Sequence, residues 1–370
     1  MKNIILLLVV LSSVQVMASR ARILALGTPM HLVDYQFMAL NPIFIHMPNA
    51  VILESGLTTS TNSRNNAEGM VVYGLEDKSR IAVALGKNDE LYMNSRVFMN
   101  SIVGAGTYSV PQNAVHAFYG NRIDNTTFSV GLSYSNFDDK VNSVKESTAG
   151  IVGSVKYGPW VGFGSYSFVN SAEAAGSKKF EGAGTLRAAG RYLVDDLTYG
   201  VDIATWTAKS STASVENESY GFQQVMARVI SSTKKDGSDL FYGAGLSSTT
   251  INCDTRASAD CSTKFSRLVL PILIGIEVNA SEFLTIRGSI TQSAVLNSTK
   301  DEIGLPATSG IAGANGSVSD FGSAGNNTTI AGGIGIKVRN MIIDGTMATA
   351  TNQKIDTSNF ISQVALTYNF

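Results

Sequence analysis

The sequence has few charges, few prolines and no long apolar run beyond its first residues. Charged residues make up 15% of the chain and only 7 residues are proline, whereas soluble domains carry roughly 25% charged residues. Past residue 18 the longest apolar run is Leu268 to Ile276, and a membrane-spanning helix needs about 20 residues. We therefore expect no transmembrane helix in the mature chain. The net charge of −1 gives no reason to expect a nucleic-acid partner.

Cysteine and histidine are scarce as well. Cys253 and Cys261 lie in a polar loop, and in an exported chain we expect them to form a disulfide. His116 is the only histidine after residue 48, so we expect no metal site. The glycine-rich pieces complete no nucleotide motif, and no nucleophile motif accompanies His116. We therefore expect no cofactor and no enzymatic activity.

Residues 1–18 have the pattern of a secretory signal peptide. Lys2 supplies the positive end, Ile4 to Leu11 form the apolar stretch, and Ala18 supplies a small residue at the cleavage site. We therefore expect an exported mature chain that begins at Ser19 and is periplasmic, secreted or embedded in an outer membrane.

The last eleven residues have the two-residue period of a strand. The even positions from Phe360 to Phe370 are apolar except Ser362, and the odd positions are smaller and mostly more polar. A membrane barrel pairs such a last strand with its first, and its aromatic side chains lie at the lipid–water boundary. We expect Phe370 to be the contact for the barrel-insertion machinery.

From about residue 49 onward, sixteen segments show strand periodicity. Their approximate spans are 49–57, 67–75, 79–86, 113–121, 126–136, 145–157, 159–169, 180–193, 197–209, 217–231, 238–251, 264–278, 282–296, 328–339, 341–351 and 358–370. Short connections alternate with longer ones, the latter being 58–66, 87–112, 137–144, 170–179, 210–216, 252–263, 297–327 and 352–357. This alternation predicts an all-β fold, a transmembrane up-and-down antiparallel β-barrel of about sixteen strands over residues 49–370, with both termini on the periplasmic side.

Charged residues on the more polar face of the predicted strands indicate which side of the barrel holds water. They alternate with apolar neighbours, and an unpaired charge is costly in lipid, so we expect the apolar face to meet outer-membrane lipid and the charged face to line a polar lumen. Tyrosines and tryptophans near the predicted strand ends suit the headgroup region. The pore-lining candidates are Asp89, Glu90, Arg96, Arg187, Arg191, Asp202, Arg267, Glu277, Arg287, Lys337, Arg339 and Asp344.

Three of these candidates belong to a piece with partial helical periodicity, Asp89 to Val103, within the first long connection. It is expected either to fold into the pore as a constriction or to lie outside as a small cap. In the predicted strand from Leu268 to Ile276, Pro271 cannot donate to the sheet ladder, so it marks a bulge, a kink or a small gap in the wall.

Residues 19–48 precede the first strand. They contain Ser19-Arg20-Ala21-Arg22 with Gly27, followed by Leu40-Asn41-Pro42-Ile43. In these positions the chain resembles the FadL-like outer-membrane transport family, although it has Ile43 where that family usually has Ala. The resemblance implies a barrel of fourteen strands with the N-terminal segment folded inside as a plug, and transport of hydrophobic compounds. The count of sixteen strands is closer to general porins.

The sequence therefore predicts a channel in the outer membrane of a Gram-negative bacterium that passes small solutes through a polar lumen. The alternatives are a FadL-type transporter of hydrophobic compounds and a structural or adhesive surface barrel. The sequence leaves open which solute passes and whether the chain forms a homo-oligomer. Barrels of 14 to 16 strands are wide enough to enclose a lumen, which favours the channel.

Overall fold

The computed structural model describes residues 19–55, 67–75, 78–87, 90–104, 107–111, 114–182, 184–256, 264–298, 327–350 and 363–370. These residues form one antiparallel sheet of seventeen strands. The strands are β1 (Ala50–Ser55), β2 (Ala67–Gly74), β3 (Ser79–Leu85), β4 (Val115–Ile123), β5 (Thr126–Asp139), β6 (Val144–Tyr157), β7 (Trp160–Ala174), β8 (Lys178–Glu181), β9 (Leu186–Val194), β10 (Leu197–Thr212), β11 (Val215–Lys235), β12 (Ser238–Arg256), β13 (Lys264–Asn279), β14 (Leu284–Ser298), β15 (Asn327–Val338), β16 (Met341–Ala350) and β17 (Gln363–Asn369).

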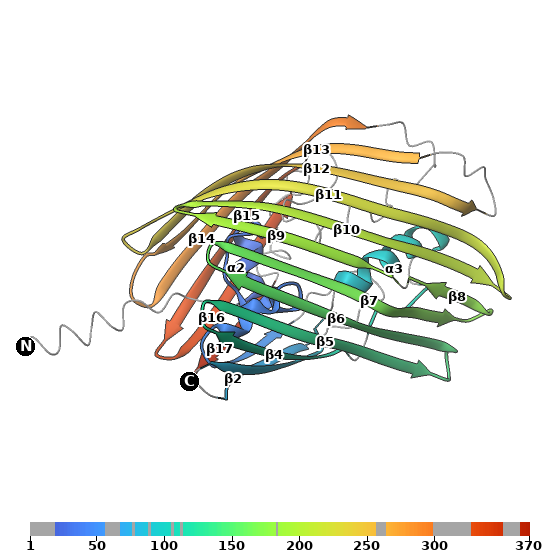
Figure 1. The fold of residues 1–370 in the computed structure, drawn as a ribbon, viewed down its shortest axis with the longest axis horizontal. Helices are drawn as coiled ribbons and strands as arrows, with labels where there is room; N and C mark the ends of the chain where they lie inside the picture. The colour runs from blue at the N-terminus through green and yellow to red at the C-terminus, as the bar shows by residue number, and fades with distance from the viewer. Residues whose placement is uncertain are drawn as a thin grey trace, which may run out of the picture.

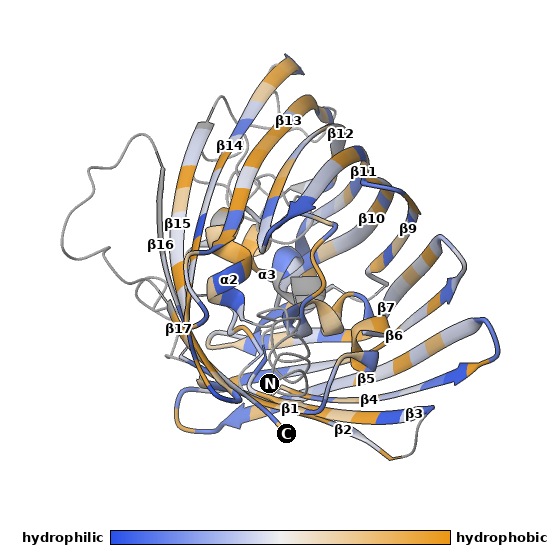
Figure 2. Ribbon diagram, turned by 90° about the vertical axis from the view of Figure 1, so that its left-hand side faces the viewer, coloured by the Kyte–Doolittle hydropathy of each residue, from blue (hydrophilic) through white to orange (hydrophobic). Residues whose placement is uncertain are grey.

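The sheet closes into a barrel, because the last strand pairs with the first (Figure 2). The ladder between β1 and β17 runs from Ala50↔Asn369 to Ser55↔Val364. Strands β8 and β9 are two pieces of one interrupted strand, since both lie between β7 and β10. The seventeen strands therefore occupy sixteen positions, and the predicted antiparallel barrel of sixteen strands is confirmed.

The two faces of each strand have opposite character, as the two-residue period predicts. In β17, Val364 and Tyr368 are exposed on the outer surface, while Ala365 and Thr367 are buried inside. In β10, Tyr199, Val201 and Ile203 are exposed in the same way. Most of the tyrosines and tryptophans near the predicted strand ends are exposed as well, namely Tyr73, Tyr119, Tyr134, Tyr157, Trp160, Tyr199, Tyr242 and Tyr368. Large apolar side chains thus cover the outside of the barrel.

Tight turns join the strands at the end where the C-terminus lies (Figure 1). Asp124, Asp195 and Asp236 occupy such turns with φ of 49°, 49° and 50°, a conformation that Asp tolerates better than most residues. At the opposite end, three predicted loops are shorter than expected. The connections predicted over 137–144, 170–179 and 210–216 are turns at 140–143, 175–177 and 213–214, because the flanking strands continue. Polar side chains extend these strands, since ladder hydrogen bonds use only the backbone.

The barrel wall is of unequal length around its circumference (Figure 1). Strand β1 has 6 residues and β3 has 7, whereas β11 has 21 and β12 has 19. At about 3.4 Å per residue, β11 is roughly 70 Å long and β1 roughly 20 Å. The wall formed by β10 to β13 therefore extends well past the short wall formed by β1 to β3.

Residues 19–48 lie inside the barrel, near the end with the tight turns. They form three short helices, α2 (Arg20–Ala25), η1 (Tyr35–Ala39) and η2 (Pro42–His46). The side chain of the residue before each helix accepts a hydrogen bond from a backbone N–H of its first turn, and the capping residues are Ser19, Asp34 and Asn41. Such caps satisfy donors that a short helix cannot satisfy itself. We name residues 19–48 the N-terminal segment.

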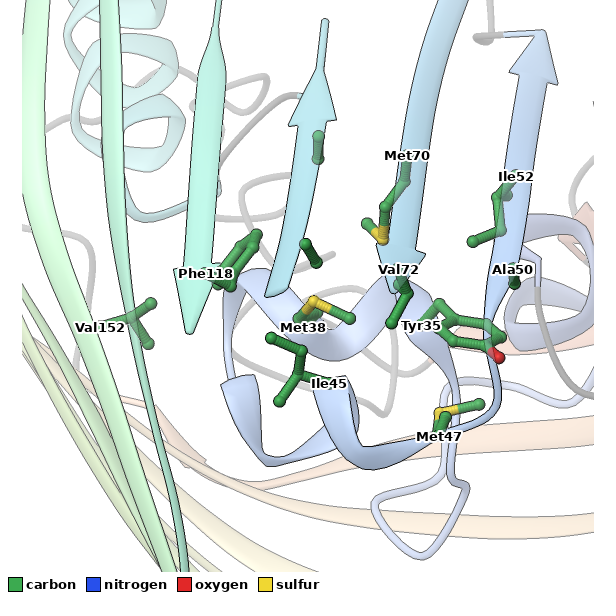
Figure 3. Close-up of a cluster of buried hydrophobic side chains, with 12 residues drawn as sticks. Tyr35, Met38, Ile45, Met47, Ala50, Ile52, Met70, Val72, Phe118 and Val152 are labelled. Carbon is green, nitrogen blue, oxygen red and sulfur yellow. The ribbon is translucent and has the colours of Figure 1, made fainter. Parts of the chain in front are cut away.

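Apolar contacts hold the N-terminal segment against the inner wall (Figure 3). Tyr35, Met38 and Ile45 pack with the inward residues Val72 and Phe118 in one buried cluster. Leu26 and Leu32 join a second cluster, whose wall members are Met226, Ile230, Phe241 and Leu273. The lumen is therefore partly filled by apolar packing, whereas the sequence predicted a polar lumen.

Helix α3 (Glu90–Val103) lies in the connection between β3 and β4 and folds into the lumen (Figures 1 and 2). Phe98 is fully buried. The centroid of its ring lies 5.2 Å from that of Trp206 and 5.2 Å from that of Tyr220. Of the two expected positions for this piece, the interior one is correct. Among the described residues, no helix is long and apolar enough to cross a membrane.

Candidate functional site

A cavity of about 810 Å³ lies between the N-terminal segment and the inner wall. The wall side comes from β4 to β7, β9 and β10 near their tight turns. The N-terminal segment contributes Met30 to Val33 and a second stretch between Asn41 and Met47. The cavity is large enough for a small organic solute, since ligand pockets commonly measure about 300–1,000 Å³.

The cavity combines apolar walls with basic groups. Leu32, Ile43 and Phe44 supply much of its apolar lining. Among its described lining residues, Arg122, Lys156 and Arg191 are cationic and Asp124 is anionic. Three positive charges and one negative charge leave a formal excess of +2 with histidine neutral, so the cavity favours a negatively charged solute.

His46 lines the same cavity and is held by the wall. Its Nε2 lies 3.4 Å from the backbone oxygen of Phe128 in β5. Burial lowers the pKa of His46 below its ordinary value, and the nearby positive charges of Arg122 and Arg80 lower it further. His46 is therefore neutral at pH 7 and adds no charge there.

A cluster of arginines lies on the inner wall beside the cavity. Asp202 of β10 accepts hydrogen bonds from Arg187 and Arg191 of β9, at 3.1 and 3.0 Å, and from Arg228 of β11. The guanidinium carbon of Arg191 also lies 5.1 Å from the ring centroid of Phe163. Three guanidinium groups share one carboxylate, which leaves a formal excess of +2 on this part of the wall.

Ion pairs anchor the N-terminal segment to the opposite wall. Arg22 donates two hydrogen bonds to Glu277 of β13, at 2.8 and 3.1 Å, and one to Asp34, at 3.2 Å. Arg287 of β14 joins Glu277, at 2.6 Å, to Asp344 of β16, also at 2.6 Å. All five side chains are at least largely buried. We name these five residues the anchor network.

A second set of contacts fixes the segment to the short wall. Arg20 donates to Glu68 of β2 at 2.8 Å, and its backbone N–H donates to Glu54 of β1 at 2.8 Å. The Lys87 ammonium donates to the backbone and side-chain oxygens of Gln36, at 2.6 and 2.7 Å. Burial lowers the pKa of Lys87, although the carboxylates of Glu68 and Glu54 oppose this shift.

Arg96 anchors helix α3. Its guanidinium donates to Asn170, at 2.8 Å, to the backbone oxygens of Ser109 and Ser171, at 2.8 and 2.9 Å, and to Glu146, at 3.3 Å. The sequence predicted Arg96 as a pore-lining residue, but its side chain has no exposed surface. A guanidinium with this many buried acceptors holds the helix in place and leaves no donor surface for a solute.

The other pore-lining candidates fall into three groups. Those on the inner wall are Arg187, Arg191, Asp202, Arg267, Glu277, Arg287, Lys337 and Asp344, and six of these belong to the arginine cluster or the anchor network. Arg339 does not line the lumen, because it lies exposed in the turn after β15 with φ of 56°. Asp89 and the side chain of Glu90 lie outside the described residues. So does Cys261, and its disulfide with Cys253 stays a prediction.

Several charged residues of the site did not stand out in the sequence. Arg228 was missed because both faces of its strand carry apolar residues, although Gln224 and Arg228 share the inward face with Met226. Arg22 and Asp34 lie in a segment without strand periodicity, so no pattern indicated their partners. Among the described residues, no three His, Cys, Asp or Glu side chains gather as a metal site.

Comparison with known proteins gives only distant structural similarity. No family model and no curated protein sequence matches the chain. Among solved structures it is similar to the CymD monoaromatic hydrocarbon channel, with 10% identity, a TM-score of 0.41, and coverage of 95% of this chain and 97% of that chain. It is also similar to the toluene transporter TbuX of Ralstonia pickettii, with 11% identity, a TM-score of 0.39, and coverage of 95% and 98%. A third similar structure is OmpT of Vibrio cholerae in its trimer form, with 12% identity, a TM-score of 0.39, and coverage of 87% of this chain and 98% of that chain. These values are too low to transfer a function.

Proposed function

We propose that this protein is an outer-membrane channel of a Gram-negative bacterium that passes small solutes without catalysing a reaction. The observation that carries the proposal is the inverted polarity of the closed barrel. Leu, Ile, Val, Tyr and Trp side chains are exposed on its outside, while its inside contains buried ion pairs and a cavity. In water such an outer surface would be a large exposed apolar patch, whereas in a bilayer it meets acyl chains.

The charge of the interior supports a preference for anions. The cavity and the arginine cluster share Arg191, and each has a formal excess of positive charge. A positive field along a water-filled path raises the local concentration of anions and lowers that of cations. The N-terminal segment and helix α3 narrow the lumen, so the proposed substrates are small anionic solutes.

Planar-bilayer recording of the refolded mature chain tests this proposal. In a tenfold gradient of potassium chloride we expect discrete channels whose reversal potential shows a preference for chloride. Arg191→Gln and Lys156→Gln should each reduce that preference, because each removes one cavity charge. Lys209→Gln is the matched control, since Lys209 is exposed on the outer face and pairs with Glu216. A folded barrel that conducts no ions, or that prefers potassium, contradicts the proposal.

An interruption in one ladder of the wall favours a second candidate function, the transport of hydrophobic compounds. The ladder between β12 and β13 runs through Ala244↔Ile272 and resumes at Ser247↔Val269. Pro271 lies in this interval and has no N–H to donate. The two strands still pack closely there, because a Cβ added to Gly245 would lie 3.4 Å from the Pro271 ring. A route between lumen and lipid would therefore require β12 and β13 to separate at this interruption of the ladder.

Binding of an apolar fluorescent probe distinguishes the two candidates. A hydrophobic-compound transporter should bind the probe at micromolar concentration and conduct few ions, and Pro271→Val should slow probe uptake into vesicles. Leu273→Val is a matched control, because it changes an inward side chain of the same strand and leaves the ladder donors intact. An ion-conducting barrel without probe binding supports the anion channel.

A further inference from the structure

Ser19 occupies a fully buried position within the anchor network, although it lies at the start of the N-terminal segment. Its backbone nitrogen donates to Oδ2 of Asp34 at 3.3 Å, and its hydroxyl donates to Oδ2 of Asp344 at 2.9 Å. The exposed fraction of Ser19 is 0%, and so is that of Asp34 and of Asp344. The backbone nitrogen and the hydroxyl of Ser19 thus each donate to a different buried carboxylate.

The anchor network around Ser19 has one negative charge too many. It contains three carboxylates, from Asp34, Glu277 and Asp344, and two guanidinium groups, from Arg22 and Arg287. In formal charge the neighbouring groups do not correct this, because the two cations Arg20 and Lys87 match the two carboxylates Glu54 and Glu68. A buried charge without a counter-charge is strongly destabilising, so the network lacks one cation.

Asp34 shows where the missing cation belongs. Burial raises the pKa of Asp34 above its ordinary value, even though Arg22 and the backbone N–H groups of Gln36 and Ser19 lower it. The hydrogen-bond donors around Asp34 therefore stabilise its ionised form by less than burial destabilises it. A positive charge at the Ser19 nitrogen would lie next to Asp34 and close to Asp344.

We propose that hydrolysis of the Ala18–Ser19 peptide bond supplies this cation, and that the new α-ammonium group of Ser19 locks the N-terminal segment into the barrel. A signal peptidase adds one water across the bond, which leaves a carboxylate on Ala18 and an amine on Ser19. The amine takes up the proton released by the carboxyl group. Its ordinary pKa of about 7.7–8.0 keeps it protonated at neutral pH, and charge-assisted hydrogen bonds to carboxylates are stronger than neutral ones.

The consequence is that the segment binds firmly only after the leader has been removed. In the unprocessed chain Ser19 presents a neutral amide N–H, and the anchor network has three negative charges against two positive ones. In the processed chain the count is three against three. Cleavage therefore makes the counter-ion for its own binding site, and the segment is held firmly inside the lumen only in the exported protein.

Accessibility of the α-amine tests this directly in the wild-type protein. The mature chain, purified from outer membranes in detergent, is treated with an acetylating reagent at pH 7.5, and its N-terminal peptide is followed by mass spectrometry. We expect the chain to begin at Ser19 and its α-amine to react at least tenfold more slowly in the folded barrel than after unfolding. A different first residue, or equal rates, overturns the proposal.

An added glycine between Ala18 and Ser19 tests the role of the charge. The Gly-extended chain keeps all side chains but moves the ammonium by one residue and restores a neutral amide at Ser19. Heat-modifiable migration in gels verifies that the barrel has folded. Tryptic cleavage after Arg20 and Arg22 should then be at least fivefold faster than in the parent chain. Unchanged cleavage overturns the proposal.

Asp34→Asn supplies a readout that a purely structural role would not give. In the parent chain it removes the partner of the ammonium and should accelerate tryptic cleavage. In the Gly-extended chain it removes the excess negative charge and should slow cleavage, because asparagine can still cap η1. Acceleration of cleavage in both chains would show that Asp34 acts through its shape alone and would overturn the charge-based lock.

Discussion

Arg22 and Glu277 are 255 positions apart in the sequence and form a bidentate ion pair inside the barrel. The guanidinium comes from helix α2 of the N-terminal segment and the carboxylate from β13 of the wall. Neither side chain is more than 16% exposed. The pair ties the N-terminal segment to the barrel wall, and the other residues of the anchor network orient both partners.

Arg22→Gln should release the N-terminal segment. Breaking a buried ion pair costs about 3 kcal/mol or more, because the remaining carboxylate keeps its desolvation cost. Since each 1.4 kcal/mol is a factor of ten, the segment should open about 100-fold more often. The rate of chymotryptic cleavage at Tyr35 measures this in the folded barrel.

Arg20→Gln is the matched control, because Arg20 carries the same charge two residues earlier. Its side chain is 27% exposed and pairs with Glu68 at 2.8 Å. A half-screened pair of this kind contributes roughly 1 kcal/mol or less. Equal effects of the two substitutions on cleavage would show that general charge, and not the anchor network, holds the segment.

Arg96→Met should detach helix α3 from the wall. Methionine preserves the apolar part of the side chain but leaves Glu146 and the Asn170 side chain without this donor. The expected loss is about 3 kcal/mol. We expect a larger unitary conductance, since α3 occupies lumen space, and faster proteolysis within residues 90–104.

The control for α3 is Val97→Ala, which changes the adjacent, half-buried side chain. Truncation of a half-buried valine costs roughly 1 kcal/mol, so the helix should stay in place and the conductance should be unchanged. If Arg96→Met also leaves the conductance unchanged, helix α3 does not constrict the path.

Acidification should increase the preference for anions through His46. The pKa of His46 is lowered by burial, so the ring stays neutral until the pH falls below its ordinary value of about 6.5. A folded-state pKa below the unfolded value means that protonation opposes folding of η2, and this contribution to stability is lost as the pH falls. We expect the reversal potential, measured between pH 8 and pH 5, to move towards the equilibrium potential of chloride only below about pH 6.5.

His46→Asn should abolish this acidic shift while leaving the reversal potential at pH 8 unchanged, because the wild-type ring is neutral there. An identical pH profile in the variant would assign the shift to another group. The asparagine side chain retains a donor for the Phe128 carbonyl, which limits structural effects.

Phe370→Ala should impair assembly in cells more than folding in detergent. Phe370 is 52% exposed on the outer surface, where its ring stacks with those of Tyr73 and Tyr368. A terminal aromatic ring that is this accessible can contact the insertion machinery that we propose as a partner. We expect several-fold less heat-modifiable protein in outer membranes and a similar refolded yield in vitro. Phe283→Ala, at an exposed ring in a turn, is the control.

The strand pattern was readable in the sequence because each strand buries one face. The alternation at the C-terminus, with Val364 and Tyr368 outward and Ala365 and Thr367 inward, follows from backbone geometry alone. The same local rule predicted all sixteen strand positions of the barrel. Strand ends were less predictable, because polar residues such as Ser210 and Ser211 continue the ladder of β10 without an apolar signal.

The sequence by itself determined the closed barrel and its oily exterior, since both depend on a period of two residues that any strand must obey. Only the tertiary structure decided which charges meet. Arg22 finds Glu277, and three arginines surround Asp202, because closing the barrel brings distant strands and the N-terminal segment into one low-dielectric interior. In that interior a charge must find a partner or remain costly, and no local pattern records which partner it finds.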